Sequence, residues 1–221
     1  MKKRQTIRVL LTALVCCAVM ALVDGVIHPP YAVKSAVKLI LFLGLPWLLT
    51  HASGGIPFKT IFRFRKRGFG VALGLGLGLY ALILGVYFLL ARFVDFSGIV
   101  ENLSQNAGVN KGNFLFVSLY ISFVNSLLEE FFFRGFVFLN LKPAGRSLAY
   151  SFSAGLFALY HVAMMTGWFS PGIYLLAILG LAAGGTIFNL LNEKLGTIYV
   201  SWLTHMFANF AINTIGFLLM A

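Results

Sequence analysis

The chain has 221 residues and a formal net charge of +11, with 60% hydrophobic and only 10% charged residues. At a mean hydropathy of +0.92, one soluble core cannot hide the apolar side chains, so most of the surface must face lipid. The apolar runs are long and continuous and do not alternate with a period of two, which argues against a β-barrel. The sequence therefore predicts an all-α, polytopic bundle of transmembrane helices.

Seven apolar segments approach the ~20 residues that a helix needs to cross a bilayer core of about 30 Å. They are residues 9–28, 33–50, 69–92, 114–140, 148–166, 171–191 and 197–219. Pro46 interrupts the second segment, which makes it the weakest of the seven. We divide the chain into an N-terminal three-span region, residues 1–113, and a four-span region, residues 114–221, that holds the motifs described below.

Basic residues are divided unevenly between the two ends of these spans. Twelve of the seventeen fall at the end where the chain begins: Lys2, Lys3, Arg4, Arg8, Lys59, Arg63, Arg65, Lys66, Arg67, Lys142, Arg146 and Lys194. We place Lys34, Lys38, Arg92 and Lys111 at the opposite end. The positive-inside rule then predicts a cytoplasmic N-terminus. The positive charge is thus explained as a topology signal, and no nucleic acid is predicted as a partner.

Glycines repeat every fourth residue in two of the spans. Gly70, Gly74 and Gly78 share one face of the third span, and Gly180 and Gly184 repeat the spacing in the sixth. The first run lacks the strand-to-helix setting and the Lys-Ser/Thr end of a phosphate loop. Small residues at this spacing let membrane helices approach closely, so we predict helix contacts at both faces.

Glu129, Glu130 and Arg134 lie inside the fourth span, where charge is costly enough to indicate function. Residues four apart share a helix face, so Glu130 can neutralise Arg134. Glu129 is turned away and shares its face with Asn125. One glutamate is thus predicted to be paired, and the other to be available for chemistry. The structural alternative is a buried ionic cluster that only locks two helices together.

Polar residues also lie inside two later spans. His161 is in the fifth, and the seventh contains His205 and Asn209, which share a face. At 1.5 Å of rise per residue from the nearest cytoplasmic loop, Glu129, His161 and His205 come out about 18, 20 and 13 Å deep. We therefore expect these residues to converge in an intramembrane active site.

Three motifs follow one another along the chain: Glu-Glu-x-x-x-Arg, Phe-x-x-x-His and His-x-x-x-Asn. Together they closely resemble those of the CAAX prenyl endopeptidase and bacteriocin-processing family of intramembrane proteases, also called the CPBP or Abi family. The motif positions are filled by Glu129, Glu130, Arg134, Phe157, His161, His205 and Asn209. The resemblance covers roughly residues 114–213, and the first three spans match only in being hydrophobic. Residues 114–221 would accordingly be the catalytic core.

Hydrolysis of a peptide bond needs an activated water, a donor for the developing oxyanion and a proton for the leaving amine. Glu129 with His161 can activate and orient the water, and His205 and Asn209 can donate to the oxyanion. This set requires no cofactor. The resemblance also implies such a glutamate-type mechanism.

A zinc site is the alternative for the same residues. His161, His205 and Glu129 would form a His₂Glu set, which leaves the other glutamate as base. Against zinc, the histidines form no compact His-x-x-x-His pair, and Asn209 is a poor zinc ligand. We favour a metal-free site and keep Zn²⁺ as the alternative cofactor.

The predicted activity is hydrolysis of a peptide bond in a membrane-associated or C-terminally modified protein or peptide, within the lipid bilayer. The resemblance implies an integral protein of a bacterial cytoplasmic membrane. A catalytically silent scaffold or immunity protein of the same family is the first alternative. A proton-coupled transporter is the second, although we find no internal repeats or discontinuous helices of the kind that transporters usually show.

Overall fold

The computed structural model describes residues 3–53, 55–66 and 68–220, and all regular secondary structure in these ranges is helical. The elements are α1 (Lys3–Leu22), η1 (Val23–Ile27), α2 (Tyr31–Leu39), η2 (Ile40–Gly44), α3 (Leu45–Ser53), α4 (Phe58–Ile61), α5 (Phe69–Leu90), α6 (Ser97–Ala107), α7 (Phe114–Tyr120), η3 (Ile121–Asn125), α8 (Ser126–Glu129), η4 (Glu130–Phe138), α9 (Leu139–Leu141), η5 (Lys142–Ala144), α10 (Arg146–Met164), α11 (Pro171–Leu195) and α12 (Ile198–Met220). The elements η1 to η4 are π-helical, and η5 is a 3₁₀ turn.

Within the described ranges, seven helical stretches are long and apolar enough to cross a membrane. They are Lys3–Ile27, Tyr31–Ala52, Phe69–Leu90, Phe114–Ala144, Arg146–Met164, Pro171–Leu195 and Ile198–Met220. Each overlaps one predicted span, which confirms the all-α, polytopic fold class. The second stretch stays continuous through Pro46 because the wider π-helical turn η2 lies directly before it, where the proline leaves a backbone hydrogen bond unmade.

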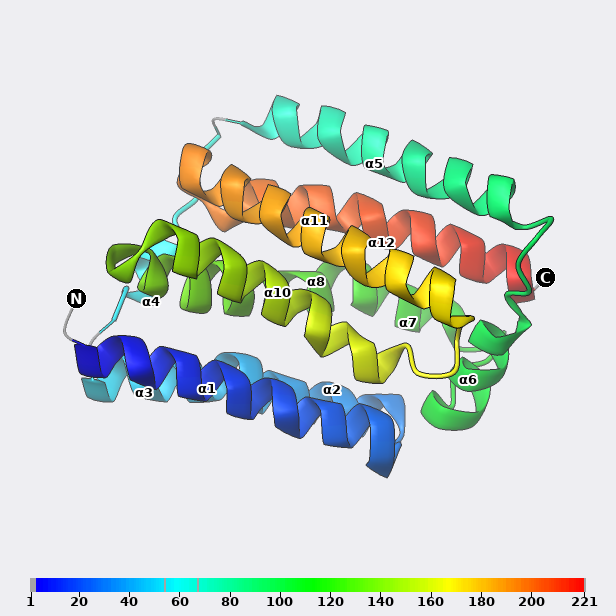
Figure 1. Ribbon diagram of the computed structural model, residues 1–221, viewed down its shortest axis with the longest axis horizontal. Helices are drawn as coiled ribbons and strands as arrows, with labels where there is room; N and C mark the ends of the chain where they lie inside the picture. Colours follow the sequence, from blue (N-terminus) through cyan, green and yellow to red (C-terminus); the bar gives the residue numbers. More distant parts are fainter. Residues whose placement is uncertain (1–2, 54, 67, 221) are drawn as a thin grey trace.

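The helices form one elongated bundle. The pair of α1 and the α2–α3 helix lies along one side, and α5 lies along the opposite side (Figure 1). Between them, α10 packs on α1, α11 on α10, and α12 on α5. The two chain termini lie at opposite ends of the bundle (Figure 1), as an odd number of crossings requires.

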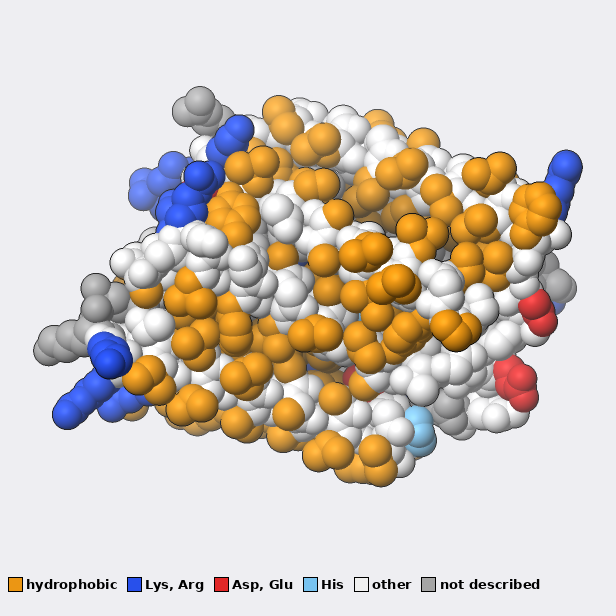
Figure 2. Space-filling model, in the orientation of Figure 1, with side chains coloured by type: hydrophobic (Ala, Val, Ile, Leu, Met, Phe, Trp, Pro, Cys, Tyr) orange, Lys and Arg blue, Asp and Glu red, His pale blue; other side chains and the backbone are white. Residues whose placement is uncertain are grey.

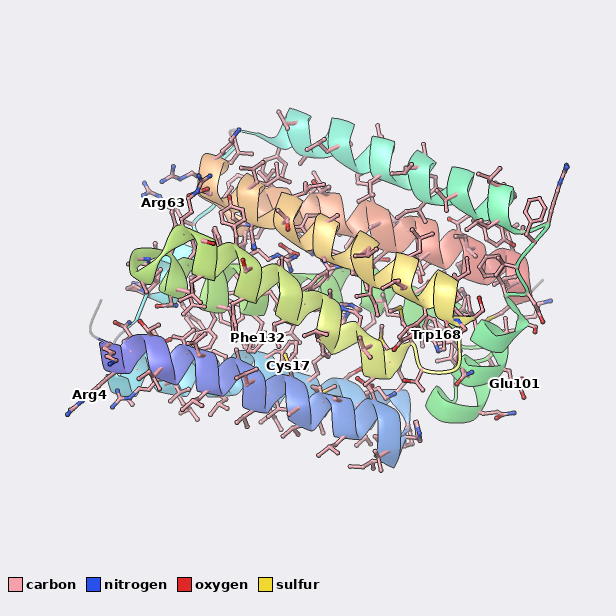
Figure 3. All side chains as sticks on the ribbon, viewed as in Figure 1. Arg4, Cys17, Arg63, Glu101, Phe132 and Trp168 are labelled. Carbon is pink, nitrogen blue, oxygen red and sulfur yellow. The ribbon has the colours of Figure 1, made fainter. Side chains whose placement is uncertain are left out.

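Charged side chains are sorted between the two ends of the bundle. Lys and Arg gather at the end where the chain begins (Figure 2), and Arg4 and Arg63 project there, whereas Glu101 lies at the other end (Figure 3). The predicted position of Lys38 at that other end is wrong. Its side chain is buried between helices, because the carboxylate of Glu129 offers it a partner there.

The fourth span occupies the centre of the bundle. Every residue of η4 is buried, so apolar side chains are required on all of its faces. Phe132 stacks on Phe42 of η2 with 4.0 Å between ring centres, while Phe133 meets Phe157 of α10 edge-on at 5.3 Å. The charged residues of this span are therefore held in a packed aromatic core.

The glycine prediction is wrong about the contact faces. A Cβ would meet none of the described atoms within 4 Å at Gly70, Gly74, Gly78, Gly180 and Gly184. At Gly76, by contrast, a Cβ would lie 2.4 Å from Phe207 of α12, and at Gly185 it would lie 3.2 Å from Ala154 of α10. Because α5 is apolar on every face, glycine spacing alone could not distinguish the lipid-facing side from the protein-facing side.

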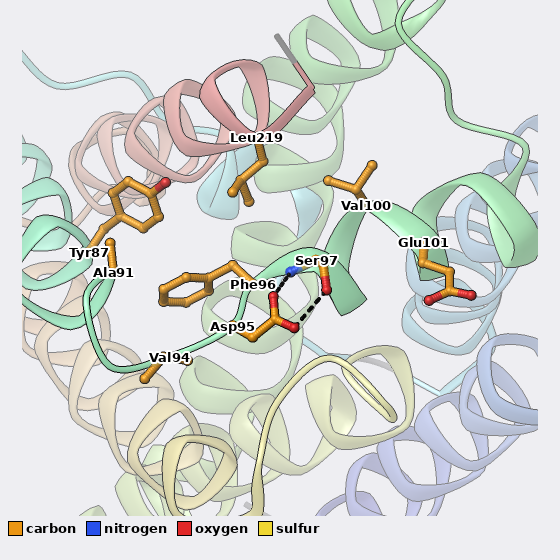
Figure 4. A pocket seen from close by; sticks show the side chains of 9 residues that line it. All are labelled: Tyr87, Ala91, Val94, Asp95, Phe96, Ser97, Val100, Glu101 and Leu219. Carbon is orange, nitrogen blue, oxygen red and sulfur yellow. Dashed lines mark hydrogen bonds between the residues drawn. The ribbon is translucent and has the colours of Figure 1, made fainter.

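A hollow of about 720 Å³ lies at the end of the bundle remote from the N-terminus, where α5, α6 and α12 meet (Figure 4). Asp95 on its wall accepts hydrogen bonds from the backbone N–H and the hydroxyl of Ser97, at 2.8 and 2.9 Å. These bonds favour the ionised carboxylate and lower the pKa of Asp95. Asp95 thus fixes the start of α6, and the hollow contains none of the predicted site residues.

Candidate active site

Glu129 and Glu130 lie at the point where the fourth span changes from α-helix to π-helix. Glu129 is the last residue of α8 and Glu130 the first of η4, with exposed fractions of 2% and 0%. Short π-helical segments often occur at functional sites, because they redirect side chains inside an otherwise regular helix. Two adjacent carboxylates are thereby placed in the centre of the bundle, where each needs polar partners.

Glu130 has two partners on one oxygen. Its Oε1 lies 3.3 Å from Nη1 of Arg134, as the four-residue spacing predicts. The same Oε1 lies 3.0 Å from Nδ1 of His205 on α12. Glu130 thus connects the arginine to a predicted catalytic histidine, a link that the sequence did not reveal.

Arg134 is fully buried and lies between aromatic rings. The centre of its guanidinium is 4.2 Å from the ring centre of Phe157 and 5.0 Å from that of Phe188 on α11. A cation this close to a ring face is stabilised electrostatically. The geometry therefore gives Phe157 a physical role, and it adds Phe188, which the sequence analysis did not single out.

Hydrogen bonds at Nδ1 fix the tautomers of both histidines. Nδ1 of His161 lies 2.7 Å from the carbonyl oxygen of Phe157, which can only accept, so this nitrogen carries the hydrogen. Nδ1 of His205 faces the Glu130 carboxylate and carries its hydrogen for the same reason. When both rings are neutral, each Nε2 is an acceptor.

These two Nε2 atoms face one oxygen of Glu129. Oε2 of Glu129 lies 3.9 Å from Nε2 of His161 and 3.7 Å from Nε2 of His205. Both distances are too long for direct hydrogen bonds. Two polar atoms at this separation can be bridged by a water molecule. The structure thus brings together Glu129, His161 and His205, from three different spans.

The other oxygen of Glu129 is held by donors. Oε1 accepts a 3.1 Å hydrogen bond from Nδ2 of Asn125 and lies 2.5 Å from Nζ of Lys38 on α2. The prediction that Glu129 is unpaired is therefore wrong. Lys38, about two turns inside the apolar second span, was the signal that could have identified this partner, because charge inside a span indicates a specific role.

Asn209 makes its hydrogen bond outside this set. Its Nδ2 donates to the carbonyl oxygen of Ile121 at 3.1 Å, and Asn213 one turn later donates to the carbonyl oxygen of Ser118, also at 3.1 Å. The two amides thus attach α12 to the α7–η3 part of the fourth span. The second N–H of the Asn209 amide is not used in this bond.

A zinc ion does not fit these side chains as they are placed. The donor types of His161, His205 and Glu129 are suitable, but no three His, Cys, Asp or Glu side chains in the described ranges are placed to hold a metal ion. The ammonium of Lys38 on Glu129 would also repel a divalent cation. The side chains as placed therefore do not support a metal-dependent step.

The comparisons with known proteins decide the family. Residues 111–211 match the family model described as type II CAAX prenyl endopeptidase Rce1-like. Residues 111–211 are thus an Rce1-like family domain. The matched segment contains all seven motif residues, from Glu129 to Asn209, whereas Lys38 lies outside it. No curated protein and no solved structure matches the chain.

Membership of the Rce1-like family implies a protease that acts on a protein or peptide. The seven hydrophobic helices indicate an integral protein of a lipid bilayer. The family match and the geometry thus concern the same part of the chain, because Glu129, His161 and His205 lie both in the matched segment and in the buried polar cluster.

Proposed function

We propose that this Rce1-like protein is an intramembrane endopeptidase in which Glu129 activates a water molecule. The observation that carries the proposal is the position of Glu129 Oε2, which faces the Nε2 atoms of His161 and His205 while Oε1 is held elsewhere. One water can reach all three acceptors and donate its two hydrogens among them. Such a water is oriented, and its proton has a base within hydrogen-bond distance.

In the proposed reaction, Glu129 takes a proton from the water as the water oxygen bonds to the carbonyl carbon of the scissile peptide. The electron pair of the C=O bond moves to the carbonyl oxygen. When the tetrahedral intermediate collapses, the C–N bond breaks and the nitrogen receives the proton from Glu129. The C=O bond re-forms, and the products are one fragment that ends in a carboxylic acid, which ionises by releasing its proton to water, and one that begins with an amine.

The oxyanion requires donors aimed at it. The second N–H of Asn209 is one candidate, and Nε2 of His205 is the other when this ring is protonated. Glu130 supports the second role, because its carboxylate at 3.0 Å from Nδ1 stabilises positive charge on the His205 ring. Arg134 in turn neutralises Glu130, and Phe157 positions Arg134.

The substrate is proposed to be a membrane-associated or C-terminally modified protein or peptide. We assign the basic end of the bundle to the cytoplasm by the positive-inside rule. We propose a bacterial cytoplasmic membrane as the location. Residues 114–221 would form the catalytic core, and residues 1–113 would flank it.

A catalytically silent scaffold is the second candidate, and one observation favours it. The carboxylate of Glu129 is already paired with Lys38, so its charge is balanced without a substrate. In a scaffold the same residues would only hold three spans together, since breaking a buried ion pair is strongly destabilising. The two candidates differ in what Glu129→Gln does to cleavage, because this exchange keeps the shape of the side chain but removes its negative charge and with it the base.

Purified protein in detergent tests the proposal directly. The wild type and Glu129→Gln are incubated with a farnesylated peptide that ends in a CAAX sequence, and mass spectrometry detects the release of the C-terminal fragment. A second arm compares membrane peptides from cells that lack the chain with those from cells that express either form. Cleavage by the wild type and loss of cleavage in Glu129→Gln support a protease. Identical peptides in all samples of both arms favour the scaffold.

A further inference from the structure

Lys38 lies outside the Rce1-like segment and forms an ion pair with the predicted base, Glu129. It lies on α2 in the second span, and its exposed fraction is 5%. Its Nζ is 2.5 Å from Oε1 of Glu129 and 2.5 Å from Oδ1 of Asn125. A buried lysine is costly unless it is paired, so this position is specified by its partners.

Two aromatic rings also lie close to the ammonium. Nζ of Lys38 lies 4.8 Å from the ring centre of Tyr160 on α10 and 5.3 Å from that of Phe42 on η2. The rings exclude water and attract the cation. The ammonium is therefore held at one point, and the carboxylate that it contacts is held with it.

Because of Lys38 and Asn125, the two oxygens of Glu129 have different surroundings. Both donate to Oε1, with Asn125 Nδ2 at 3.1 Å. Oε2 is left facing the Nε2 atoms of the two histidines. A carboxylate anchored by one oxygen cannot rotate freely about its Cγ–Cδ bond, so the second oxygen keeps its direction.

We propose that Lys38 is a positioning residue of the active site, supplied by the N-terminal region. It orients the Glu129 carboxylate so that Oε2 meets the reacting water, and its charge keeps this carboxylate ionised. This inference rests on the proposed function. It extends the active site beyond residues 111–211, since the catalytic geometry would then depend on the docking of the second span against the fourth.

Lys34 provides a matched control on the same helix. Its Nζ lies 2.9 Å from Asp24, so it also forms an ion pair between two spans, with a carboxylate that is buried. Asp24 belongs to η1, and its ion pair with Lys34 does not involve Glu129. Loss of Lys34 should therefore reproduce the structural effect of losing a lysine from α2 without the effect on the base.

The test measures kcat and KM for cleavage of an internally quenched farnesylated CAAX peptide by Lys38→Met, Lys38→Arg and Lys34→Met. A displacement of about 1 Å in a catalytic group can cost roughly 10²-fold in rate, so we expect Lys38→Met to lower kcat about 100-fold with KM changed less than about twofold. Lys38→Arg should recover part of kcat, and Lys34→Met should retain the wild-type value. Unchanged or increased kcat in Lys38→Met would overturn the proposal, because Lys38 would then be a spectator or an inhibitory clamp.

Infrared spectroscopy supplies a readout that does not require turnover. A protonated carboxylic acid gives a C=O stretching band, which is assigned to Glu129 if Glu129→Gln removes it. At neutral pH we expect this band in folded Lys38→Met and not in the wild type or Lys34→Met. If the wild type cleaves no peptide but the band appears in Lys38→Met, the proposed function fails for that substrate while the positioning contact stands. A Lys38→Met spectrum without the band refutes the role of Lys38.

Discussion

Glu130 accepts a hydrogen bond from His205 at 3.0 Å while it pairs with Arg134 at 3.3 Å through the same oxygen. The carboxylate of Glu130 therefore has two different roles. Toward Arg134 it balances a fully buried cation, and toward His205 it fixes which ring nitrogen carries the hydrogen. In the proposed mechanism, stability and catalysis depend on the same atom, and mutation can separate the two.

Glu130→Ala should damage both stability and activity, and Arg134→Met should restore only the stability. Removing one partner of a buried ion pair costs about 3–5 kcal/mol, because the other charge is left uncompensated. Thermal unfolding of the double variant should return towards the wild-type Tm. Peptide cleavage should stay low, since His205 still lacks its acceptor. Recovery of cleavage in the double variant would show that the bond between Glu130 and His205 has no catalytic part.

Glu129→Gln should abolish cleavage by orders of magnitude with a smaller loss of stability than Glu130→Ala. The amide keeps the volume of the side chain but cannot take a proton from water. It leaves Lys38 without its ionic partner, so some loss of Tm is expected, and Lys38→Met in addition should restore it. Calorimetry and the peptide assay on the same preparations make the comparison. Turnover that persists in Glu129→Gln would transfer the role of base to another group.

The sequence predicted the architecture well because hydropathy reports directly on the length of each membrane span. It also predicted the pair of Glu130 and Arg134, because the spacing of four residues is local to one helix. The approach of Glu129, His161 and His205 came from estimated depth together with the motif resemblance. Such inferences need no knowledge of which helices are neighbours.

The features that were missed all depend on helix neighbours. Lys38 was placed at the end of its span, since nothing in one sequence shows that α2 packs beside the fourth span. Phe188 appeared as one apolar residue among many in α11, and only the fold places it against Arg134. The close contact of Gly76 with Phe207 was missed because α5 is apolar on all faces.

Phe157→Leu should destabilise the protein moderately, and Phe157→Ala more strongly. Leucine fills much of the space but has no ring to face the guanidinium of Arg134, and a desolvated cation–π contact contributes about 2 kcal/mol. Alanine also leaves a cavity, for which about 3–5 kcal/mol is typical. Leu159, which is exposed on the same helix, is the control, and Leu159→Ala should change Tm little. Equal Tm values for Phe157→Leu and the wild type would exclude the cation–π role.

Chelation of divalent metals should leave cleavage by the purified protein unchanged. The His161, His205 and Glu129 side chains are not placed to hold a metal, and Lys38 would oppose one by charge. The measurement compares initial rates before and after treatment with a chelator, with a zinc protease as a positive control for metal removal. A loss of activity that added zinc reverses would favour the metalloprotease alternative and require these side chains to rearrange.

The last prediction tests how α5 packs on α12. Gly76→Ala places a methyl group 2.4 Å from Cδ2 of Phe207, so the side chain of Phe207 must shift, whereas the same exchange at Gly74 meets no described atom within 4 Å. Overpacking of this kind typically costs about 1–3 kcal/mol. Because α12 also carries His205, we expect Gly76→Ala to lower both Tm and cleavage, and Gly74→Ala to preserve both. Unfolding and cleavage are measured for both variants in the same detergent. If the two glycines respond alike, α5 does not contact α12 closely through Gly76.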